Sequence, residues 1–232
     1  MFSDIDLNKK LLSHYEMWKP ETDIIIVGSS PSLLWHKFGK YIDEHKNVVR
    51  INKCFSQDCH EYTGKKIDTW ATTNNERWNR FNPINQSTKE VWVRVPCTCQ
   101  EFIDNGTFDS FSGQCIPMRD NRKKCVYGSM TFNNFGHPGL GTGLIAINYA
   151  LQRFKKITII GHTFYLESID GAALDFHSEK EDEEHAKNRK NFFKENEYGL
   201  ASLRYVADWI KNDKIILLNP YEYDNLRCVN NA

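Results

Sequence analysis

Short apolar runs recur along this chain, and most are ended by glycine or a polar residue. The run Ile24–Val27, which Gly28 ends, is too short for a helix and is dominated by β-branched residues. Such a run is typical of a buried parallel strand. The same reasoning predicts further strands at 47–52, 67–71, 90–95, 156–161 and 214–219.

Helices are predicted between these strands. Residues 33–45 are expected to form the helix that links the first two strands, and the mostly apolar stretch 144–154 forms another. Residues 1–22 have the spacing of a short amphipathic helix that ends before Pro20. Strands that alternate with helices predict an α/β fold, a doubly wound, Rossmann-like sheet that is mostly parallel.

The 232 residues suffice for one sizeable α/β domain, so we assign 1–232 to a single domain. Residues 96–135 mix Pro, Gly, Cys, Asn and basic residues without clear elements, which is typical of a functional lid or a surface loop. Residues 166–200 are a second expected lid segment, within a stretch, 178–213, that is highly charged and largely helical.

Charge and composition exclude some classes of function. Lys+Arg and Asp+Glu both number 30, so nothing global favours a nucleic acid or an anionic membrane as partner. No apolar run is long enough to span a membrane, and the first residues lack a basic-then-apolar signal. We therefore expect a chain that is cytoplasmic or peripheral to a membrane. The odd number of cysteines, 7, favours reduced thiols.

Metal ligands are hard to find in the sequence. No Asp-x-Asp pair follows a predicted strand, since Asp4 and Asp6 lie in the N-terminal tail. No metal site is therefore predicted, and no cofactor. One group of cysteines has a spacing unlike that of a standard zinc finger or ribbon, so whether it binds a metal stays open. These cysteines are Cys97, Cys99, Cys115 and Cys125.

The loop after the first strand is the first candidate for anion binding. Gly28 would let the backbone approach a phosphate closely, and Ser29 or Ser30 can cap a helix that begins at Pro31. Backbone N–H groups at a helix N-terminus attract anions. Asn52 ends the second strand and would face the same crevice. The alternative is an ordinary strand–turn–helix with a capping serine, because the full dinucleotide glycine fingerprint is absent.

A second candidate lies in the second half of the chain. Gly139-Leu-Gly-Thr-Gly143 opens the helix at 144–154, and glycines with a threonine at a helix N-terminus again suit an anion. Two such sites suggest a nucleotide-phosphate ligand. An enzyme without a metal must stabilise its leaving group with hydrogen bonds and helix dipoles, which suits a nucleoside monophosphate better than a diphosphate.

These motifs resemble those of the sialyltransferases. The resemblance is closest to glycosyltransferase family 29, whose fold is a variant of the GT-A type, and the bacterial family 42 enzymes share part of it. It covers 23–75 and 139–165 and rests on the order and spacing of several motifs. Val27-Gly-Ser-Ser-Pro-Ser-Leu33, Val49-Arg-Ile-Asn52 and Gly64-Lys-Lys-Ile-Asp68 resemble the large sialylmotif, and Gly141-Thr-Gly143, Ile157-Thr-Ile-Ile-Gly161 and Phe164-Tyr165 the small one.

The resemblance implies an inverting, metal-independent transfer of sialic acid from CMP-sialic acid to a hydroxyl of a glycan or glycolipid. CMP-sialic acid is then a donor substrate, not a cofactor. By position, the resemblance implies donor contacts at Gly28, Ser29, Ser30, Asn52, Asn74, Gly141, Thr142 and Gly143.

The resemblance also implies two catalytic residues. Tyr165 matches a tyrosine that hydrogen-bonds the departing phosphate, and His177 matches the histidine base that deprotonates the acceptor. The ordinary pKa of histidine suits that role. His185 competes for it, because the charged stretch after His177 is longer than the family pattern. Arg50 is expected to be structural.

Departures from the pattern leave alternatives open. Ser29 stands where both families favour asparagine, and the usual cysteine at the start of the large motif is missing, so we expect no disulfide between the two motifs. A different nucleotide-dependent transferase or a pyrophosphokinase on the same scaffold is one alternative. A catalytically silent CMP-binding protein is another.

Overall fold

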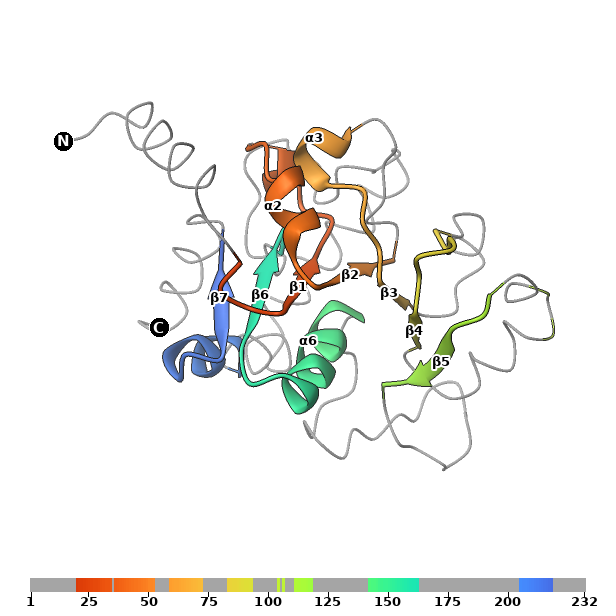
Figure 1. The fold of residues 1–232 in the computed structure, drawn as a ribbon. Coiled ribbons are helices and arrows are strands. Elements are labelled where there is room, and N and C mark those ends of the chain that lie inside the picture. The colour runs from red at the N-terminus through yellow and green to blue at the C-terminus, as the bar shows by residue number, and fades with distance from the viewer. Residues whose placement is uncertain are drawn as a thin grey trace, which may run out of the picture.

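The computed structural model describes residues 20–34, 36–52, 59–72, 83–93, 104, 106, 111–118, 142–162 and 205–218. In this part of the chain, seven strands form one sheet, and every neighbouring pair is parallel (Figure 1). The strands are β1 (Ile24–Val27), β2 (Asn47–Ile51), β3 (Thr69–Thr72), β4 (Glu90–Val93), β5 (Gln114–Pro117), β6 (Ile157–Ile160) and β7 (Ile215–Leu217). The helices are the 3-10 turn η1 (Pro31–Leu34), α2 (Gly39–Glu44), α3 (His60–Thr63) and α6 (Thr142–Arg153), and residues 205–211 are also helical.

The strand order reverses at the centre of the sheet. The order is β5-β4-β3-β2-β1-β6-β7, so the chain builds outward from β1 and then returns to place β6 on the other side of β1. Ile25 pairs with Thr158 across this junction, and the Thr22 and Thr158 hydroxyls are 2.7 Å apart in a buried hydrogen bond. In open α/β sheets, ligands bind outside the carboxyl ends of the strands at such a reversal.

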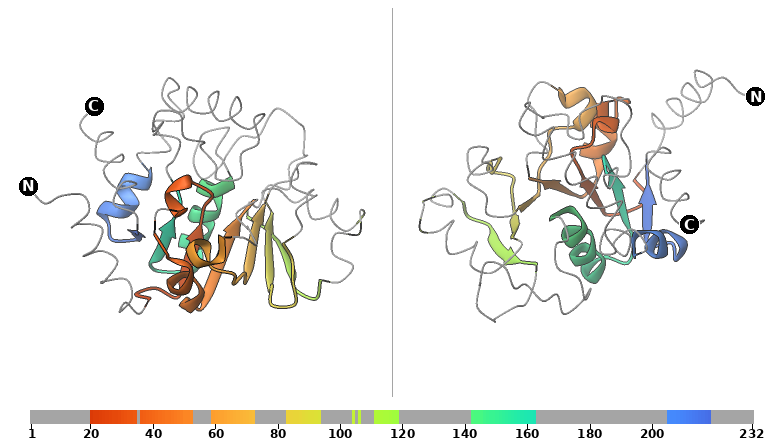
Figure 2. Two further views of the ribbon diagram at one scale, coloured as in Figure 1. Left: turned by 90° about the horizontal axis from the view of Figure 1, so that it is seen from above. Right: turned by 180° about the vertical axis from the view of Figure 1, so that it is seen from behind.

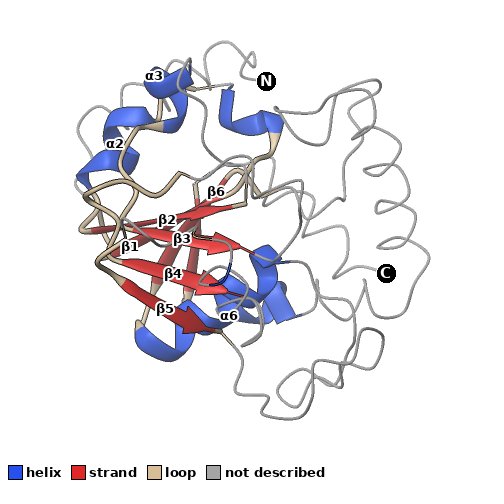
Figure 3. Cartoon of the chain, turned by 90° about the vertical axis from the view of Figure 1, so that its right-hand side faces the viewer, coloured by secondary structure: helices blue, strands red, loops and turns tan. Residues whose placement is uncertain are grey.

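Helices cover both faces of the sheet, as Figure 3 shows for α2 and α3 on one side and α6 on the other. Ile24 and Ile26 of β1 belong to the core with α6 and the 205–211 helix. Ile25 and Val27 face the opposite way, toward η1 and α2. Because both faces are covered, the central strands β1, β2 and β6 are mostly apolar, which is why short apolar runs predict them well. Figure 2 shows the same layers from two further directions.

Arg50 of β2 is fully buried on the α2 face of the sheet. Its Nε donates to the Lys66 carbonyl at 2.9 Å, and its Nη1 donates to the Thr63 carbonyl at 2.6 Å. Its Nη2 lies 3.9 Å from Asp43 Oδ1. Arg50 therefore fixes α3 and the loop before β3 against the sheet, which confirms the structural role expected of it.

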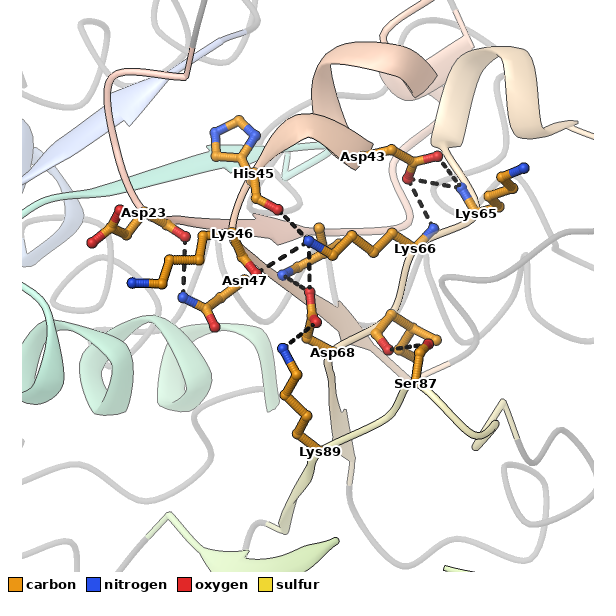
Figure 4. A network of polar contacts seen from close by, with 12 residues as sticks. Asp23, Asp43, His45, Lys46, Asn47, Lys65, Lys66, Asp68, Ser87 and Lys89 are labelled. Atoms are coloured by element: carbon orange, nitrogen blue, oxygen red, sulfur yellow. Dashed lines mark hydrogen bonds and ion pairs between the residues drawn. The ribbon is translucent and has the colours of Figure 1, made fainter.

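A polar network closes the amino edge of the sheet, away from the strand ends where a ligand is expected (Figure 4). Asp43 accepts hydrogen bonds from the backbone of Lys65 and Lys66. Asp68 accepts from the Val48 backbone at 2.9 Å and pairs with Lys89 Nζ at 2.9 Å. Much of the large motif, including 64–68, thus serves the scaffold.

Two expectations about secondary structure are wrong. The helix expected over 33–45 is replaced by η1 and the separate six-residue helix α2. A β-carbon on Gly39 would lie 2.0 Å from the His60 carbonyl oxygen, so α2 begins where α3 packs closest. The stretch 96–135 is not wholly irregular, because it contains β5, which pairs with β4 at the edge of the sheet.

The thiol expectation is wrong at one position. Cys115 of β5 is disulfide-bonded, and its partner is not among the described residues, whereas Cys59 is a free thiol. A disulfide sulfur is not a thiolate, so Cys115 cannot be a zinc ligand in this state. Cys97, Cys99 and Cys125 lie outside the described residues.

Several elements expected from the sequence lie wholly or partly outside the described residues. Of the expected N-terminal helix over 1–22, residues 1–19 lie outside the described part, as do most of 96–135 and all of 166–200. No helix in the described part is long and apolar enough to cross a membrane. Within the same part, no group of three or more His, Cys, Asp or Glu side chains is placed to hold a metal ion.

Candidate functional site

Backbone hydrogen bonds between the chain segments of β1 and β6 continue past the carboxyl ends of the two strands. The backbone N–H of Gly28 donates to the Ile160 carbonyl at 2.8 Å, and that of Ser30 donates to the Gly161 carbonyl at 2.9 Å. The Leu33 N–H donates to the Ser30 carbonyl at 3.0 Å, which forms η1. These backbone donors are therefore engaged within the fold, and a four-residue turn replaces the expected long helix.

Gly28 is required by the packing of the two strands. A β-carbon at Gly28 would lie 2.1 Å from the Gly161 carbonyl oxygen, which no real β-carbon could tolerate. Gly161 has a φ of +72°, a conformation that favours glycine. The structure thus gives Gly28 a role in packing against Gly161, the residue after β6, and the donor contact expected at Gly28 stays a prediction.

His162 follows directly and lies between two of the predicted donor-binding glycines. A β-carbon on Gly28 would lie 3.0 Å from His162 Cδ2. A β-carbon on Gly143 would lie 3.3 Å from His162 Cε1 and 3.6 Å from Cδ1 of Ile51. The ring of His162 thus stands between the end of β1 and the first turn of α6, with the end of β2 beside it.

The environment of His162 keeps its ring neutral. The residue is partly exposed, but its Nε2 atom is enclosed by protein. Burial lowers the pKa of His162 to about 4. The partial positive charge of the α6 N-terminus acts in the same direction, because it disfavours an imidazolium nearby. At neutral pH, His162 is therefore an uncharged, planar side chain.

Asn52 occupies the carboxyl end of β2 in a left-handed conformation, with φ 49°. Its backbone N–H donates to the Ala71 carbonyl at 2.9 Å, and its carbonyl accepts from Trp70 Nε1 at 3.0 Å. Its side-chain Oδ1 is buried and accepts no hydrogen bond from any residue that the structure describes. A buried, unpaired carbonyl oxygen is costly, so it marks a place where a ligand donor would fit.

The remaining predicted donor contacts differ in how exposed they are. Ser29 is half-buried, whereas Ser30 and Thr142 are 4% and 6% exposed. Thr142 and Gly143 begin α6, which has 12 residues and therefore a substantial dipole with its positive end at this edge. The structure thus places Gly28 and Gly143 on either side of His162, and Asn52, Ser29 and Thr142 at the same edge of the sheet.

Five predicted residues cannot be placed. Asn74, Gly141, Tyr165, His177 and His185 lie outside the described residues, so their assignments stay predictions. Sequence reasoning missed His162, because a single histidine after a strand has no spacing signal. Its position directly after Gly161, at a strand end of the expected sheet, was the available clue.

Comparison with known proteins supports the resemblance that the motifs indicated. No family model matches the chain. The chain is 28% identical over 141 residues to Sialyltransferase-like protein 2 of Arabidopsis thaliana, a match that covers 60% of this chain and 29% of the relative. The chain therefore spans less than a third of that relative's length.

The chain also aligns with solved structures. Among them is a mammalian sialyltransferase in complex with Gal-beta-1-3GalNAc-ortho-nitrophenol, with 12% identity and a TM-score of 0.48, over 94% of this chain and 80% of the other. The Rossmann-like α/β class itself follows from the parallel sheet and its reversed strand order.

Proposed function

We propose that this chain is a sialyltransferase, which transfers sialic acid from CMP-sialic acid to a hydroxyl of a glycan or glycolipid. The observation that carries the proposal is that Gly28 and Gly143 lie on either side of His162 at the reversal between β1 and β6, with Asn52 at the end of the neighbouring strand β2. The similarity to the plant sialyltransferase-like protein supports the choice of donor.

In this proposal, the described residues at the carboxyl edge of the sheet contact the CMP part of the donor. Asn52 offers its Oδ1, which none of the described residues bonds, to an N–H or O–H donor, which the cytosine amine and the ribose hydroxyls of CMP supply. The N-terminus of α6, at Thr142 and Gly143, faces the phosphate and stabilises its charge. Ser29 supplies a further hydroxyl.

The proposed reaction is a single displacement with inversion. His177 takes the proton of the acceptor hydroxyl, whose oxygen forms a bond to the anomeric carbon of sialic acid. The bond from that carbon to the phosphate oxygen breaks, and CMP leaves with the bonding electrons. Tyr165 and the α6 N-terminus stabilise the leaving phosphate, so the proposed reaction needs no metal ion.

Calorimetric titration tests the donor assignment. The protein is titrated with CMP, CDP, UDP and ATP, each with and without EDTA. Preferential binding of CMP that EDTA leaves unchanged is the expected result. Binding of only a diphosphate with magnesium would contradict the proposal and favour a pyrophosphokinase or another nucleotide-dependent transferase.

A transfer assay then tests the catalytic step. CMP-sialic acid is incubated with the protein and a galactose-terminated oligosaccharide, and CMP release is followed. His177→Ala is expected to lose transfer and retain CMP binding, with His185→Ala as the matched comparison. If the unmodified protein binds CMP but transfers nothing to any acceptor, the chain is a CMP-binding protein.

A further inference from the structure

The N-terminus of α6 rests on two side chains that come from different strands. A β-carbon on Gly143 would be 3.3 Å from Cε1 and 3.5 Å from Nδ1 of His162, and 3.6 Å from Cδ1 of Ile51. His162 follows β6 and Ile51 ends β2. These two side chains therefore line the place that a side chain at Gly143 would occupy, and the first turn of α6 faces them.

The other edge of the His162 ring meets the end of β1. Its Cδ2 would lie 3.0 Å from a β-carbon on Gly28, tighter than an ordinary contact. Gly28 itself cannot move toward or away from β6, because hydrogen bonds at Gly28 and Ser30 tie the β1 turn to β6. The ring is therefore held against a fixed backbone on one side and against the start of a helix on the other.

From this arrangement we infer that His162 is a positioning residue of the donor site, whose ring sets the separation between the β1 turn and the N-terminus of α6. This inference rests on the proposed function. A phosphate bound at this edge must meet groups from both elements, and the width of the ring fixes how far apart those groups lie. His162 acts through the two backbones and not through a charge.

Two observations support a geometric role. Burial keeps the ring uncharged at neutral pH, so it offers no cationic attraction to a phosphate. Ser29, on the β1 side, and Thr142, on the α6 side, flank the two glycines that meet the ring. A shift of the α6 N-terminus would change the distance between these hydroxyls, and a misplacement of about 1 Å at a ligand site can cost two orders of magnitude in function.

Three variants test the inference by CMP titration. His162→Ala removes the ring and is expected to raise the Kd for CMP by about tenfold or more, because the α6 N-terminus can then shift. His162→Phe keeps a planar ring without nitrogen atoms and is expected to keep the Kd within about threefold, a far smaller change. Ile147→Ala is the control, since Ile147 is fully buried in α6 but belongs to the core facing the sheet.

The control separates positioning from stability. Ile147→Ala is expected to lower the urea midpoint of unfolding and to leave the Kd for CMP unchanged at a temperature where it is folded. If His162→Ala keeps the wild-type Kd, the inference is wrong while the proposed function stands. If His162→Phe loses affinity as strongly as His162→Ala, the ring nitrogens matter and the spacer role is wrong.

Coupling between His162 and Gly143 gives a second test. Gly143→Ala places a methyl group against the ring and is expected to weaken CMP binding, and removing the ring makes room for that methyl group. The double variant, His162→Ala with Gly143→Ala, should therefore lose less affinity than the product of the two single losses. If the two substitutions reduce CMP affinity independently of each other, the inference is wrong, even where His162→Ala alone weakens binding. If the unmodified protein binds no CMP, the proposed function fails and this inference with it.

Discussion

Asn52 has two features that do not stabilise the fold and that binding of a ligand would explain. Its φ of 49° suits glycine at least as well as asparagine, and its buried Oδ1 has no hydrogen-bond partner in the described part of the chain. Neither feature stabilises the fold. Both are explained if the side chain is kept for a ligand.

Asn52→Gly therefore separates stability from binding. The free energy of unfolding is expected to change by less than about 1 kcal/mol, because the loss of backbone rigidity offsets the relief of the buried oxygen. The Kd for CMP is expected to rise about fivefold or more, from the loss of a hydrogen bond worth roughly 1 kcal/mol. Asn47→Gly, at the opposite end of the same strand, is the matched control. Equal Kd values for both variants would remove Asn52 from the donor site.

The two glycines beside His162 are expected to respond differently to alanine. Gly28→Ala brings a methyl group against the backbone of Gly161, which cannot rotate away, so a loss of about 3 kcal/mol in the free energy of unfolding is expected. Gly143→Ala meets only side chains and gains helix propensity, so its change should stay within about 1 kcal/mol. Urea titrations of both variants check the order. A larger loss for Gly143→Ala would contradict the packing described for Gly28.

Individual residues were predicted from the sequence with uneven success. Gly28, Asn52 and Gly143 were identified because strand ends and helix starts are visible in the pattern of apolar and polar residues. The reason for Gly28 was not visible, since its neighbour Gly161 lies far along the chain. His162 was missed for the same reason: what marks it is its contact with Gly28 and Gly143, and that contact exists only in three dimensions.

At the scale of elements, Arg50 connects β2 to α3 and to the loop before β3. Arg50→Met is expected to lower the free energy of unfolding by about 3 kcal/mol, because it leaves the buried carbonyls of Thr63 and Lys66 without donors. Once folded, the variant should bind CMP with the wild-type Kd, because Arg50 lies on the face opposite α6.

The control for this prediction is Arg153→Met. Arg153 donates two hydrogen bonds to Glu90, but its side chain is 36% exposed, so the variant should cost only about 1 kcal/mol. Urea titration of the two variants compares them directly. A similar loss for both would mean that burial does not strengthen the contacts of Arg50.

Elements were predicted well where burial is complete and poorly where it is not. The central strands β1, β2 and β6 are almost wholly buried and appear in the sequence as mostly apolar runs. The edge strand β5 was missed because its residues are only partly buried and it ends in a proline, which an edge tolerates. Of the helix predicted over 33–45, only α2 forms an α-helix, and Gly39 at its start packs closely against α3.

For the whole molecule, acid is expected to reduce stability before it reaches the range in which most carboxylates titrate. Burial lowers the pKa of His36, His45 and His162, the last from 6.5 to about 4. The unfolded chain then binds protons that the folded chain does not, so stability is complete above about pH 6.5 and falls as the pH drops toward 4. His162 alone accounts for about 3 kcal/mol across that window.

Urea titrations at pH 7.5, 6 and 5 measure this dependence. His162→Phe removes one titrating group and should show a shallower loss of stability than the wild type over the same range. Parallel curves for the two proteins would mean that the ring of His162 is protonated in the folded state near its ordinary pKa.

The reversal of strand order also determines when the candidate site can form. Strands β1 to β5 come from the first half of the chain, and β6 pairs with β1 only after a long intervening segment, as the Thr22–Thr158 hydrogen bond across 136 positions shows. Contacts that close such large loops form slowly, because chain entropy must be lost before they contribute. During synthesis, β1 to β5 leave the ribosome well before α6 and β6. Assembly of the donor site and closure of the central sheet are therefore one late event, and CMP binding reports on chains that have completed it.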